Sequence, residues 1–586
     1  GSDTSQLEEA VDTTGIPTIE LSSDSEASLK VTGKPNVSKY SGRIRIPNKK
    51  YDDYELDLDR AFSMFNFESE PSTVAEALAS NESLEWRNAM KRELTSLEMN
   101  NTWILVDKPK NRNIVRNKWV FKIKRDEDGN IARYKARLVA KGFTQKYGQD
   151  YTETFSPVIR YSNLRLLFAL SVELNLETSH QDVETAFLYA DCDQEIYMYQ
   201  PEGFEAAGME NKICLLKKSI YGLKQSSRLW YKKAHEVLMN AKFKQSEIEP
   251  CIYFKISKNS IVIIGLWIDD FFIFYNDKVE ADKLKSILRQ NFKTNDLGPI
   301  THCLGMKIKR DKQNNTLKIS QEKYVDKILE KFGMSSAKQV RTPLQPNSKF
   351  SLEGENCDVP YQQLIGSLLY LSVCSRPDLS YAVTYLSQFN ISHSKEHWLA
   401  CKRILRYLIG TKSYGLVYQK SGKPLTCFVD ADWANDPRES KSFYGYVFKL
   451  ANSAVSWECQ KQKCISQSTT EAEYVGINEA AKESVYIQNL MLELFSNVNM
   501  SNTICNVETI RIYNDNQGAL ELSKDRVFRK RTKHIQVRYH YIRKLVEENK
   551  VELRYLDTEN MIADVFTKGL GPSKHKFCCE GMNLKD

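Results

Sequence analysis

Two adjacent aspartates, Asp269 and Asp270, stand between two strongly apolar runs, residues 261–268 and 271–275. Each run has the length and composition of a strand buried on at least one face, which predicts a β-hairpin with both acids at or beside its tip. Carboxylates about 4 Å apart repel by about 4 kcal/mol at an effective dielectric of roughly 20. Either the tip is fully solvated and the aspartates serve the turn, or a cation neutralises it.

A third acid favours the cation. Asp182 lies at the expected end of a strand, just before a short helical turn. If it lies beside the hairpin tip in one sheet, Asp182 and Asp269 could bind Mg²⁺ ions whose coordination is completed by substrate phosphates and water. Two such ions about 4 Å apart activate a primer hydroxyl and stabilise a leaving pyrophosphate oxygen. That chemistry is nucleotidyl transfer.

Charge is distributed unevenly along the 586 residues. Residues 1–70 hold 8 basic and 14 acidic side chains, so the rest carries a net charge of +14, against +8 for the whole chain. The acidic leader lacks helical or strand period and is expected to be disordered, whereas the basic remainder favours a polyanion partner. No apolar run approaches the roughly 20 residues that cross a bilayer. The 13 cysteines lack disulfide or zinc spacing, so we expect a soluble intracellular protein of three to five domains without membrane contact.

Two short patterns in the leader suggest functions. Residues 12–15 differ from the loop of aspartic proteases by an insertion and lack flanking apolar strands, so we reject a protease. Residues 16–21, followed by Asp24 and Glu26, resemble a SUMO-interaction motif that adds as a strand to a partner's sheet edge. A chance match in an acidic tail is the preferred interpretation.

Order is expected from residue 71. An apolar stripe from Trp86 to Leu97 has helical spacing and predicts one buried helix face. Residues 118–124 and 133–139 predict two strands joined by an Asp-Gly turn. Their polar positions are densely basic, which fits either a solvated face or contact with phosphates and stacked bases.

Several acids after residue 420 end expected strands or begin expected helices. Asp430 ends one apolar strand, and Asp515 lies near the end of another. Glu473 falls in the first turns of a helix whose preceding hydroxyls suit an N-cap, and Asp564 lies on an expected terminal helix. Each acid alone is unremarkable, because acids at strand ends are usually just solvated.

The order of motifs resembles that of a known family. Residues 133–145, 182–188 and 220–225 and the Asp269-Asp270 hairpin are similar, in the same order, to the reverse transcriptase of copia-type (Pseudoviridae) LTR retrotransposon polyproteins. The similarity runs from about residue 80 to about residue 570 and includes the ribonuclease H region of these elements.

This resemblance implies an α+β and α/β multidomain fold. It comprises a right-hand polymerase with fingers, palm and thumb, a connection region, and a ribonuclease H-like domain with a mixed five-stranded sheet. The expected boundaries are 1–70 for the leader, 71–310 for fingers and palm, 311–418 for thumb and connection, 419–570 for ribonuclease H, and 571–586 for a C-terminal tail.

The resemblance also implies a polymerase site. Asp182, Asp269 and Asp270 would be its catalytic acids and, with Val183, would hold the metal ions. Phe187 would be the steric gate under the sugar. The further contacts implied are Arg137 with Lys122 or Lys124 on the triphosphate, Tyr221-Gly222 lining the templating pocket, and Leu304-Gly305 in the primer grip. Gln225 is also expected among the nucleotide-binding residues.

Three departures from the family pattern are visible. Trp267-Ile268 stands where Tyr-Val is usual, Ser227 where Pro is common, and Tyr189-Ala190 where Asn-Gly is usual. None of them is a metal ligand, so they bear on fidelity and nucleotide affinity more than on activity.

For the C-terminal part, the resemblance assigns Asp430, Glu473, Asp515 and Asp564 to a four-carboxylate, two-metal hydrolytic site. Motif register favours these acids over their neighbours Asp432 and Glu471. His540, like His534, is expected to be structural. A basic run would contact the backbone of a hybrid, with a solvated helix start as an equal alternative: Arg526, Arg529, Lys530, Arg531, Lys533 and His534.

The implied activity is RNA- and DNA-templated DNA polymerisation with cleavage of the RNA strand of RNA–DNA hybrids. The implied cofactors are two Mg²⁺ ions per active site, with Mn²⁺ as a substitute, and the substrates are deoxynucleoside triphosphates. Expected partners are an RNA template, a DNA or tRNA-type primer, the hybrid and integrase, with the chain a monomer or homodimer. The expected location is a cytoplasmic virus-like particle, with later nuclear entry. The alternative is a host-captured, catalytically silent nucleic-acid-binding relic, which the presence of all seven acids disfavours.

Overall fold

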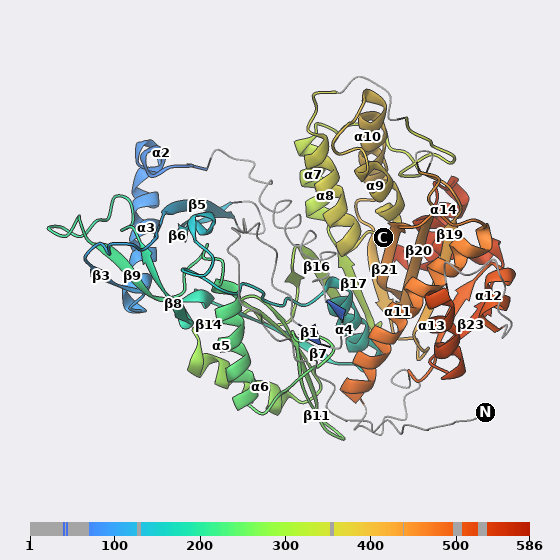
Figure 1. The fold of residues 1–586 in the computed structure, drawn as a ribbon, viewed down its shortest axis with the longest axis horizontal. Coiled ribbons are helices and arrows are strands. Elements are labelled where there is room, and N and C mark those ends of the chain that lie inside the picture. The colour runs from blue at the N-terminus through green and yellow to red at the C-terminus, as the bar shows by residue number, and fades with distance from the viewer. Residues whose placement is uncertain are drawn as a thin grey trace, which may run out of the picture. The chain divides into compact units, whose positions relative to one another are not determined.

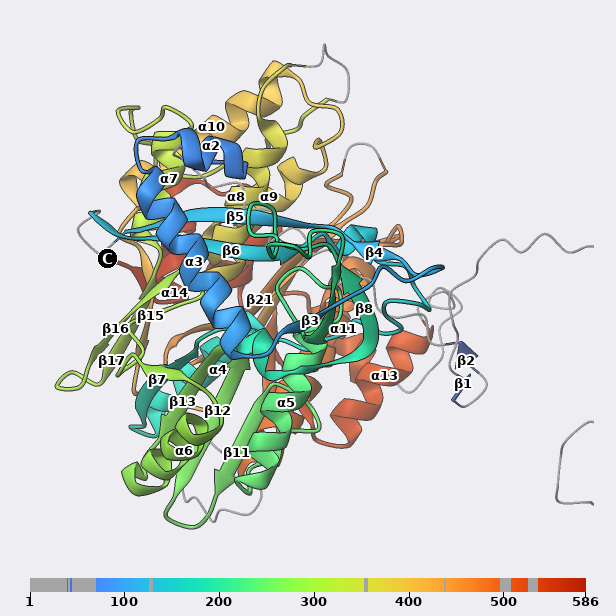
Figure 2. The same cartoon turned by 90° about the vertical axis from the view of Figure 1, so that its left-hand side faces the viewer.

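The computed structural model describes residues 70–586 except 126–129, 352–356, 437–438, 496–506 and 525–535, together with two short strands near residue 40. The chain divides into two units, residues 1–56 and 57–586. In the first unit, β1 (Lys39–Tyr40) and β2 (Arg43–Ile44) pair as antiparallel strands. All other elements belong to the second unit (Figures 1 and 2). The protease-like and SUMO-like patterns, the Asp-Gly turn and the basic run 526–534 lie outside the described residues.

The N-terminal part of the second unit packs α3 (Ser83–Met99) against a hairpin of β5 (Asn117–Arg125) and β6 (Ile131–Ala140), as Figure 2 shows. This confirms both predicted strands. The predicted apolar stripe is also confirmed, because Trp86 and Leu97 are buried and the Trp86 ring contacts the hairpin. Neighbouring elements are α2 (Val74–Ala79) and a sheet in the order β3-β9-β8-β4, formed by β3 (Trp103–Val106), β9 (Ile213–Lys218), β8 (Asp191–Met198) and β4 (Ile114–Val115).

Alternation of side chains gives the β5–β6 hairpin two different faces. Trp119 and Phe121 are buried, and Phe121 meets the Trp86 ring edge-on with 5.2 Å between centroids. On the other face, two register pairs set a cation opposite a cation, although like charges directly opposite one another destabilise a sheet. This face is therefore one that an anion would stabilise. Its register pairs are Lys124 with Arg133, Lys122 with Lys135, and Val120 with Arg137.

The central sheet has six antiparallel strands in the order β10-β11-β12-β13-β7-β14. The predicted acidic hairpin is confirmed, since Trp267 pairs with Asp270 while Ile268 and Asp269 form the turn. Ile268 adopts a left-handed conformation with φ 47°. The strands are β10 (Lys244–Gln245), β11 (Ile252–Ile256), β12 (Ile261–Trp267), β13 (Asp270–Tyr275), β7 (Glu177–Val183) and β14 (Thr294–Asp296). Associated helices are α4 (Tyr161–Glu173), α5 (Ser226–Asn240) and α6 (Lys278–Asn291).

A second five-stranded sheet joins segments that are distant in the sequence. Its order is β15-β16-β17-β18-β24, from β15 (His302–Cys303), β16 (Met306–Asp311), β17 (Thr316–Ser320), β18 (Gly415–Gln419) and β24 (Leu584–Lys585). Residues 571–586, which we assigned to a tail, form α14 (Pro572–Gly581) and the edge strand β24. Between β17 and β18 lie α7 (Glu322–Lys331), α8 (Tyr361–Cys374), α9 (Ser380–Ser387) and α10 (Lys395–Gly410).

The predicted mixed five-stranded sheet is confirmed in the C-terminal part, in the order β21-β20-β19-β22-β23. Strand β19 is antiparallel to β20 and parallel to β22, and β22 is parallel to β23. Its strands are β19 (Thr426–Asp432), β20 (Phe443–Leu450), β21 (Ser453–Lys461), β22 (Ile510–Asn514) and β23 (Val551–Tyr555). Around it lie α11 (Thr469–Phe495), α12 (Gln517–Lys524), α13 (Gln536–Glu547) and the short helix η6 (Ile562–Phe566).

Helix α4 packs against both the central sheet and β21 of the C-terminal sheet. Arg165 of α4 is 3% exposed, and its guanidinium donates to the backbone oxygens of Val373, Cys374 and Val455 at 2.7 to 2.9 Å. The same group lies 3.8 Å from the centroid of the Trp457 ring. A buried charge with these partners ties α4 to α8 and to β21 of the C-terminal sheet. None of the described helices combines the length and hydrophobicity needed to span a bilayer.

Candidate active sites

Sheet register brings the end of β7 beside the acidic hairpin. Asp182 lies directly opposite Asp270, and the Val183 amide donates to the Asp269 carbonyl at 2.9 Å. The expected juxtaposition of Asp182 with the hairpin is therefore present. The ligand atoms of these carboxylates are more widely spaced than those of the C-terminal acids. Among the described residues, the C-terminal acids form the one group of three whose ligand atoms all lie within 4.8 Å of one another.

Burial and like charge oppose the ionisation of Asp269. Burial, reinforced by the negative charges of Asp270 and Asp182, raises the pKa of Asp269 to about 6, although Arg137 acts in the opposite direction. An ionised Asp269 is therefore disfavoured in the protein alone and would gain from a nearby cation. Oxygen ligands of this kind fit a divalent ion such as Mg²⁺.

Asp270 has a partner that the sequence analysis passed over. Its Oδ1 lies 2.6 Å from Nε2 of His180, which is itself buried. The available signal was spacing, because His180 precedes Asp182 by two residues and alternation places both on one face of β7. Since His180 occupies one oxygen of Asp270, we expect Asp182 and Asp269 to be the main ion ligands and Asp270 to be held beside them.

The expected nucleotide-binding residues gather around Tyr221. The Arg137 guanidinium lies 4.5 Å from the centroid of the Tyr221 ring, and Phe187 meets that ring edge-on at 4.7 Å. Burial raises the pKa of Tyr221 to about 12, and the charges of Asp269 and Asp182 add to the shift. Tyr221 is therefore a neutral side chain within reach of the acids' electric field.

The lysines on the cationic face of the hairpin repel one another. Burial lowers the pKa of Lys135 to about 8, with Arg137 contributing. The side chain of Lys124 is largely exposed, but the surrounding protein still removes part of its hydration, and this loss lowers its pKa. The charge of Lys122 reinforces the shift, and that of Asp182 opposes it. These cations are poorly compensated by the protein, and a polyphosphate would supply the missing negative charge.

Backbone contacts fix the Tyr221-Gly222 loop. The Ala140 amide donates to the Tyr221 carbonyl at 2.8 Å, and Gly222 has φ +90°. A Cβ at Gly222 would lie 2.1 Å from the Ala140 oxygen, so only glycine fits here. Gln225 lies behind the loop, fully buried; its amide donates to a backbone carbonyl and its oxygen accepts from Gln145. Because both ends of this amide are used, we expect Gln225 to hold the loop and not to contact a nucleotide.

Residues that depart from the family pattern occupy packed positions near the acids. The Ile268 carbonyl accepts from the Trp230 indole at 2.6 Å, and the Tyr189 hydroxyl accepts from a backbone amide at 2.7 Å. Leu304, expected in the primer grip, has φ 47°, and its carbonyl accepts from the Tyr370 hydroxyl. These contacts fix Ile268 and Tyr189, two of the departures, and the primer-grip residue Leu304 in the local packing.

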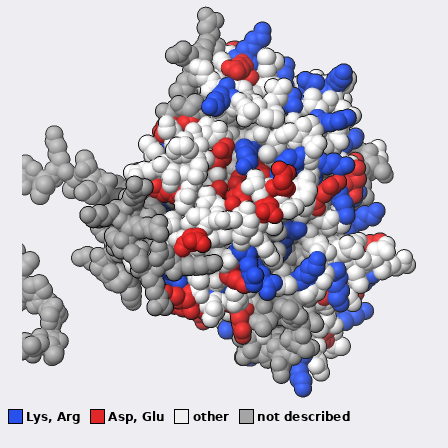
Figure 3. Space-filling model, turned by 90° about the vertical axis from the view of Figure 1, so that its right-hand side faces the viewer, with Lys and Arg blue, Asp and Glu red and all other residues white. Residues whose placement is uncertain are grey.

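Four elements of the C-terminal part supply the second set of acids. Asp430 lies in β19, Glu473 in the first turns of α11, Asp515 directly after β22, and Asp564 in η6. Oxygens of Asp430, Glu473 and Asp515 lie within 4.8 Å of one another, a donor set that fits a divalent ion. Parallel pairing of β19 with β22 places their carboxyl ends at one edge of the sheet. Figure 3 shows acidic side chains gathered in the middle of the face on this side of the molecule, with Lys and Arg around them.

The structure separates Glu471 from the cluster, whereas Asp432 stays close to it. The Glu471 carboxylate accepts from the backbone amide of Gln467 at 2.8 Å and so serves the start of α11. Asp432 lies two residues after Asp430 in β19, and burial raises its pKa to about 6. Glu473 instead accepts from the Asn514 amide at 2.8 Å, beside the trio.

Burial and mutual repulsion make this cluster hard to ionise completely. Burial, followed by the charge of Asp430, raises the pKa of Glu473 well above its usual range. The same two causes raise the pKa of Asp564 to about 6, although Lys568 opposes the shift. Burial also raises the pKa of Asp515. A cluster of this kind is stabilised by cations.

Two lysines that the sequence analysis did not single out reach Asp564. Lys568 Nζ lies 2.7 Å from Asp564 Oδ1, as a close ion pair without directed hydrogen-bond geometry, and 3.4 Å from Asp430 Oδ2. Lys574 Nζ lies 3.0 Å from the other oxygen of Asp564. The Thr567 hydroxyl donates to Asp430. The available signal for Lys568 was its spacing of four residues from Asp564.

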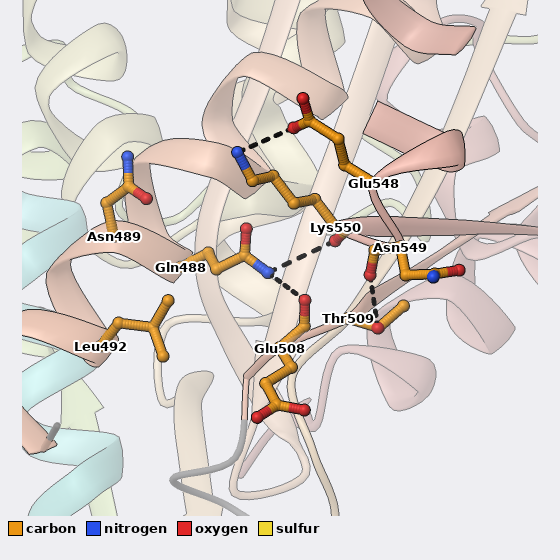
Figure 4. Close-up of a pocket in the computed structure, with 8 residues that line it drawn as sticks. All are labelled: Gln488, Asn489, Leu492, Glu508, Thr509, Glu548, Asn549 and Lys550. Atoms are coloured by element: carbon orange, nitrogen blue, oxygen red, sulfur yellow. Dashed lines mark hydrogen bonds and ion pairs between the residues drawn. The ribbon is translucent and has the colours of Figure 1, made fainter. Parts of the chain in front are cut away.

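The pocket in Figure 4 is separate from both sets of acids. It has a volume of about 360 Å³ and lies between α11 and the turns that precede β22 and β23. The Gln488 amide there donates to the backbone oxygens of Val507 and Glu508, and Lys550 pairs with Glu548 at 2.9 Å. None of the expected site residues lines this pocket.

His540, which we expected to be structural, lies on α13 with an exposed side chain.

An acidic hairpin beside a cationic hairpin defines the class of a polymerase of the reverse transcriptase type, and the mixed sheet that follows has a carboxylate cluster of its own. The family described as "Reverse transcriptase (RNA-dependent DNA polymerase)" matches residues 100–346. The Pol polyprotein of transposon TNT 1-94 from Nicotiana tabacum is 40% identical over 550 residues, which cover 92% of this chain and 40% of that protein. A transposon Ty5-1 protein of Saccharomyces cerevisiae is 32% identical over 308 residues, covering 52% of this chain and 99% of that protein.

The chain belongs to the copia-type retrotransposon Pol polyproteins and contains their reverse transcriptase region. It spans between 34% and 40% of the length of the Pol polyproteins of TNT 1-94, RE1 and RE2. Among solved structures, the foamy viral protease–reverse transcriptase in complex with double-stranded DNA is 12% identical, with a TM-score of 0.40, over 81% of this chain and 70% of that chain.

Proposed function

We propose that this chain synthesises DNA on RNA and DNA templates and cleaves the RNA strand of RNA–DNA hybrids during LTR retrotransposon replication. The observation that carries the proposal is the pairing of the Asp182 strand end with the Asp269 hairpin. Family membership supports it, because the matching family is named for RNA-dependent DNA polymerase activity.

In the polymerase site, the cationic face of the β5–β6 hairpin would hold the incoming nucleotide. The triphosphate would be bound by Arg137 and Lys124, with Lys122 beside them. Arg137 is positioned by its contact with Tyr221, and Lys124 lies close enough to Asp182 for that charge to affect its pKa. Phe187 would lie under the sugar and exclude a 2′-hydroxyl by its volume. Tyr221-Gly222 would line the templating pocket.

Asp182 and Asp269 would hold Mg²⁺, with His180 orienting Asp270 beside them. Bound there, the metal would supply Lewis-acid activation of the primer hydroxyl and stabilisation of the leaving oxygen. In the C-terminal site, Asp430, Glu473 and Asp515 would hold a divalent ion for hydrolysis of the RNA strand. Recognition there would depend on hybrid shape and 2′-hydroxyls and not on base sequence.

The test is primer extension on an RNA template by the full chain and by Asp269→Asn. Asp282→Asn, a change at an exposed position of α6, is the matched control. We expect Asp269→Asn to abolish extension and Asp282→Asn to leave it unchanged. Extension that survives Asp269→Asn would refute the polymerase site, and a wild-type chain that binds primer–template without extending it would support the silent relic instead.

Hybrid cleavage is tested separately with a labelled RNA strand annealed to DNA. Asp430→Asn should abolish cleavage, whereas Glu559→Gln, at an exposed position, should not.

The proposed partners are an RNA template, a DNA or tRNA-type primer and integrase. The proposed location is a cytoplasmic virus-like particle that later delivers its DNA to the nucleus.

A further inference from the structure

The C-terminal acid cluster contains cations of its own, and they are unevenly placed. Asp430, Glu473 and Asp515 face one another within 4.8 Å, and neither lysine contacts Glu473 or Asp515. Asp564 is different, because Lys568 approaches one of its oxygens at 2.7 Å and Lys574 the other at 3.0 Å. Asp564 is 1% exposed, whereas the side chains of Lys568 and Lys574 reach it from partly exposed positions.

Lys568 also bridges two acids. Its Nζ lies between Asp564 Oδ1 and Asp430 Oδ2, at 2.7 and 3.4 Å, which places one positive charge where a second metal ion would need the same two carboxylates. The Thr567 hydroxyl adds a hydrogen bond to Asp430. A divalent ion at this position would meet an ammonium group at close range, and the two would repel strongly. The residues around Asp564 therefore do not fit a second divalent ion while Lys568 is in place.

We propose that the ribonuclease H-like site holds one divalent ion, between Asp430, Glu473 and Asp515, and that the Lys568 ammonium replaces the second ion between Asp430 and Asp564. This proposal rests on the proposed hydrolytic site and changes the expected two metals to one metal and one lysine. Lys568 acts as a positioning residue that neutralises Asp564 and keeps Asp430 turned toward the metal.

The test counts ions and does not depend on catalysis. Bound Mn²⁺ is measured by electron paramagnetic resonance on the full chain carrying Asp182→Asn and Asp269→Asn, so that the polymerase site does not contribute. Bound Mn²⁺ is counted for the protein without nucleic acid and for the protein with a hybrid of DNA and 2′-O-methyl RNA. The same chain with Asp430→Asn serves as the blank. The variants are Lys568→Met, Lys568→Arg and, as matched control, Lys576→Met, whose lysine pairs with Glu580 on α14 outside the cluster.

We expect one Mn²⁺ in the background chain, in Lys568→Arg and in Lys576→Met, and two in Lys568→Met. Circular dichroism shows whether Lys568→Met is folded, and retention of one ion by Lys568→Arg would support the proposal even if the methionine variant does not fold. Two ions in the background chain would overturn the inference while leaving the hydrolytic site intact. One ion in a folded Lys568→Met would also overturn it. No ion in any chain, together with no hybrid cleavage by the wild type, would refute the proposed hydrolytic function itself.

Discussion

Replacement of Asp269 by asparagine should abolish primer extension and at the same time stabilise the metal-free protein. The amide has nearly the same shape as the carboxylate and can accept the same backbone hydrogen bond. It removes a negative charge that burial, Asp270 and Asp182 all oppose. As a proposed metal ligand, Asp269 would reduce the stability of the metal-free protein, which is the usual conflict between activity and stability at a functional site.

The magnitude follows from the pKa of Asp269, which rises from an ordinary value of 3.8 to about 6. Because the folded state holds the proton more tightly, ionisation destabilises it: the penalty is negligible below pH 3.8, grows as the pH rises, and is complete above pH 6. One unit corresponds to about 1.4 kcal/mol, so the penalty at pH 7 is about 3 kcal/mol. This penalty corresponds to roughly a hundredfold difference in the equilibrium constant for local opening. At pH 5 the free-energy penalty falls to about half of its value at pH 7.

Hydrogen–deuterium exchange of the β12 and β13 amides in EDTA measures this difference. At pH 7 the amides of Asp269→Asn should exchange up to about a hundredfold more slowly than those of the wild type. The gap should narrow at pH 5, and Asp282→Asn should match the wild type. Saturating Mg²⁺ should slow exchange in the wild type more than in Asp269→Asn, because only the carboxylate gains from the ion. Equal or faster exchange in metal-free Asp269→Asn at pH 7 would refute the electrostatic reasoning.

Three further predictions concern one buried structural arginine and two residues of the proposed polymerase site. Arg165→Met should lower the free energy of unfolding by about 3 kcal/mol or more, since it leaves three buried carbonyls without their donor; a loss below about 1 kcal/mol in denaturant titration would contradict this. Gly222→Ala should abolish primer extension but spare hybrid cleavage, because its Cβ collides with the Ala140 oxygen; equal loss of both activities would point to general misfolding. Arg137→Gln should raise the KM for deoxynucleoside triphosphates about 10- to 100-fold, the value of one charge-assisted hydrogen bond, with partial recovery in Arg137→Lys; an unchanged KM in steady-state kinetics would argue against triphosphate contact.

Much of the fold could be predicted from the sequence because its signals are local. The apolar runs on either side of Asp269-Asp270 left a hairpin as the natural structure, and the helical stripe from Trp86 to Leu97 marked a buried face. Alternation along β5 and β6 separated cationic from apolar positions before any neighbour was known. Periodicity and turn chemistry act within a few residues, so they can be read without the tertiary structure.

The sequence by itself thus determined the strand and helix patterns, the motif order and the candidate acids. Only the tertiary structure decided that His180 holds Asp270, that Gln225 is buried behind its loop, that β24 closes a sheet with β18, and that Lys568 lies between Asp430 and Asp564. Each of these facts depends on which side chains from different segments of the chain converge, and on how far burial alters their charges. Such contacts leave no periodic trace in the sequence, because packing between elements, and not local conformational preference, selects them.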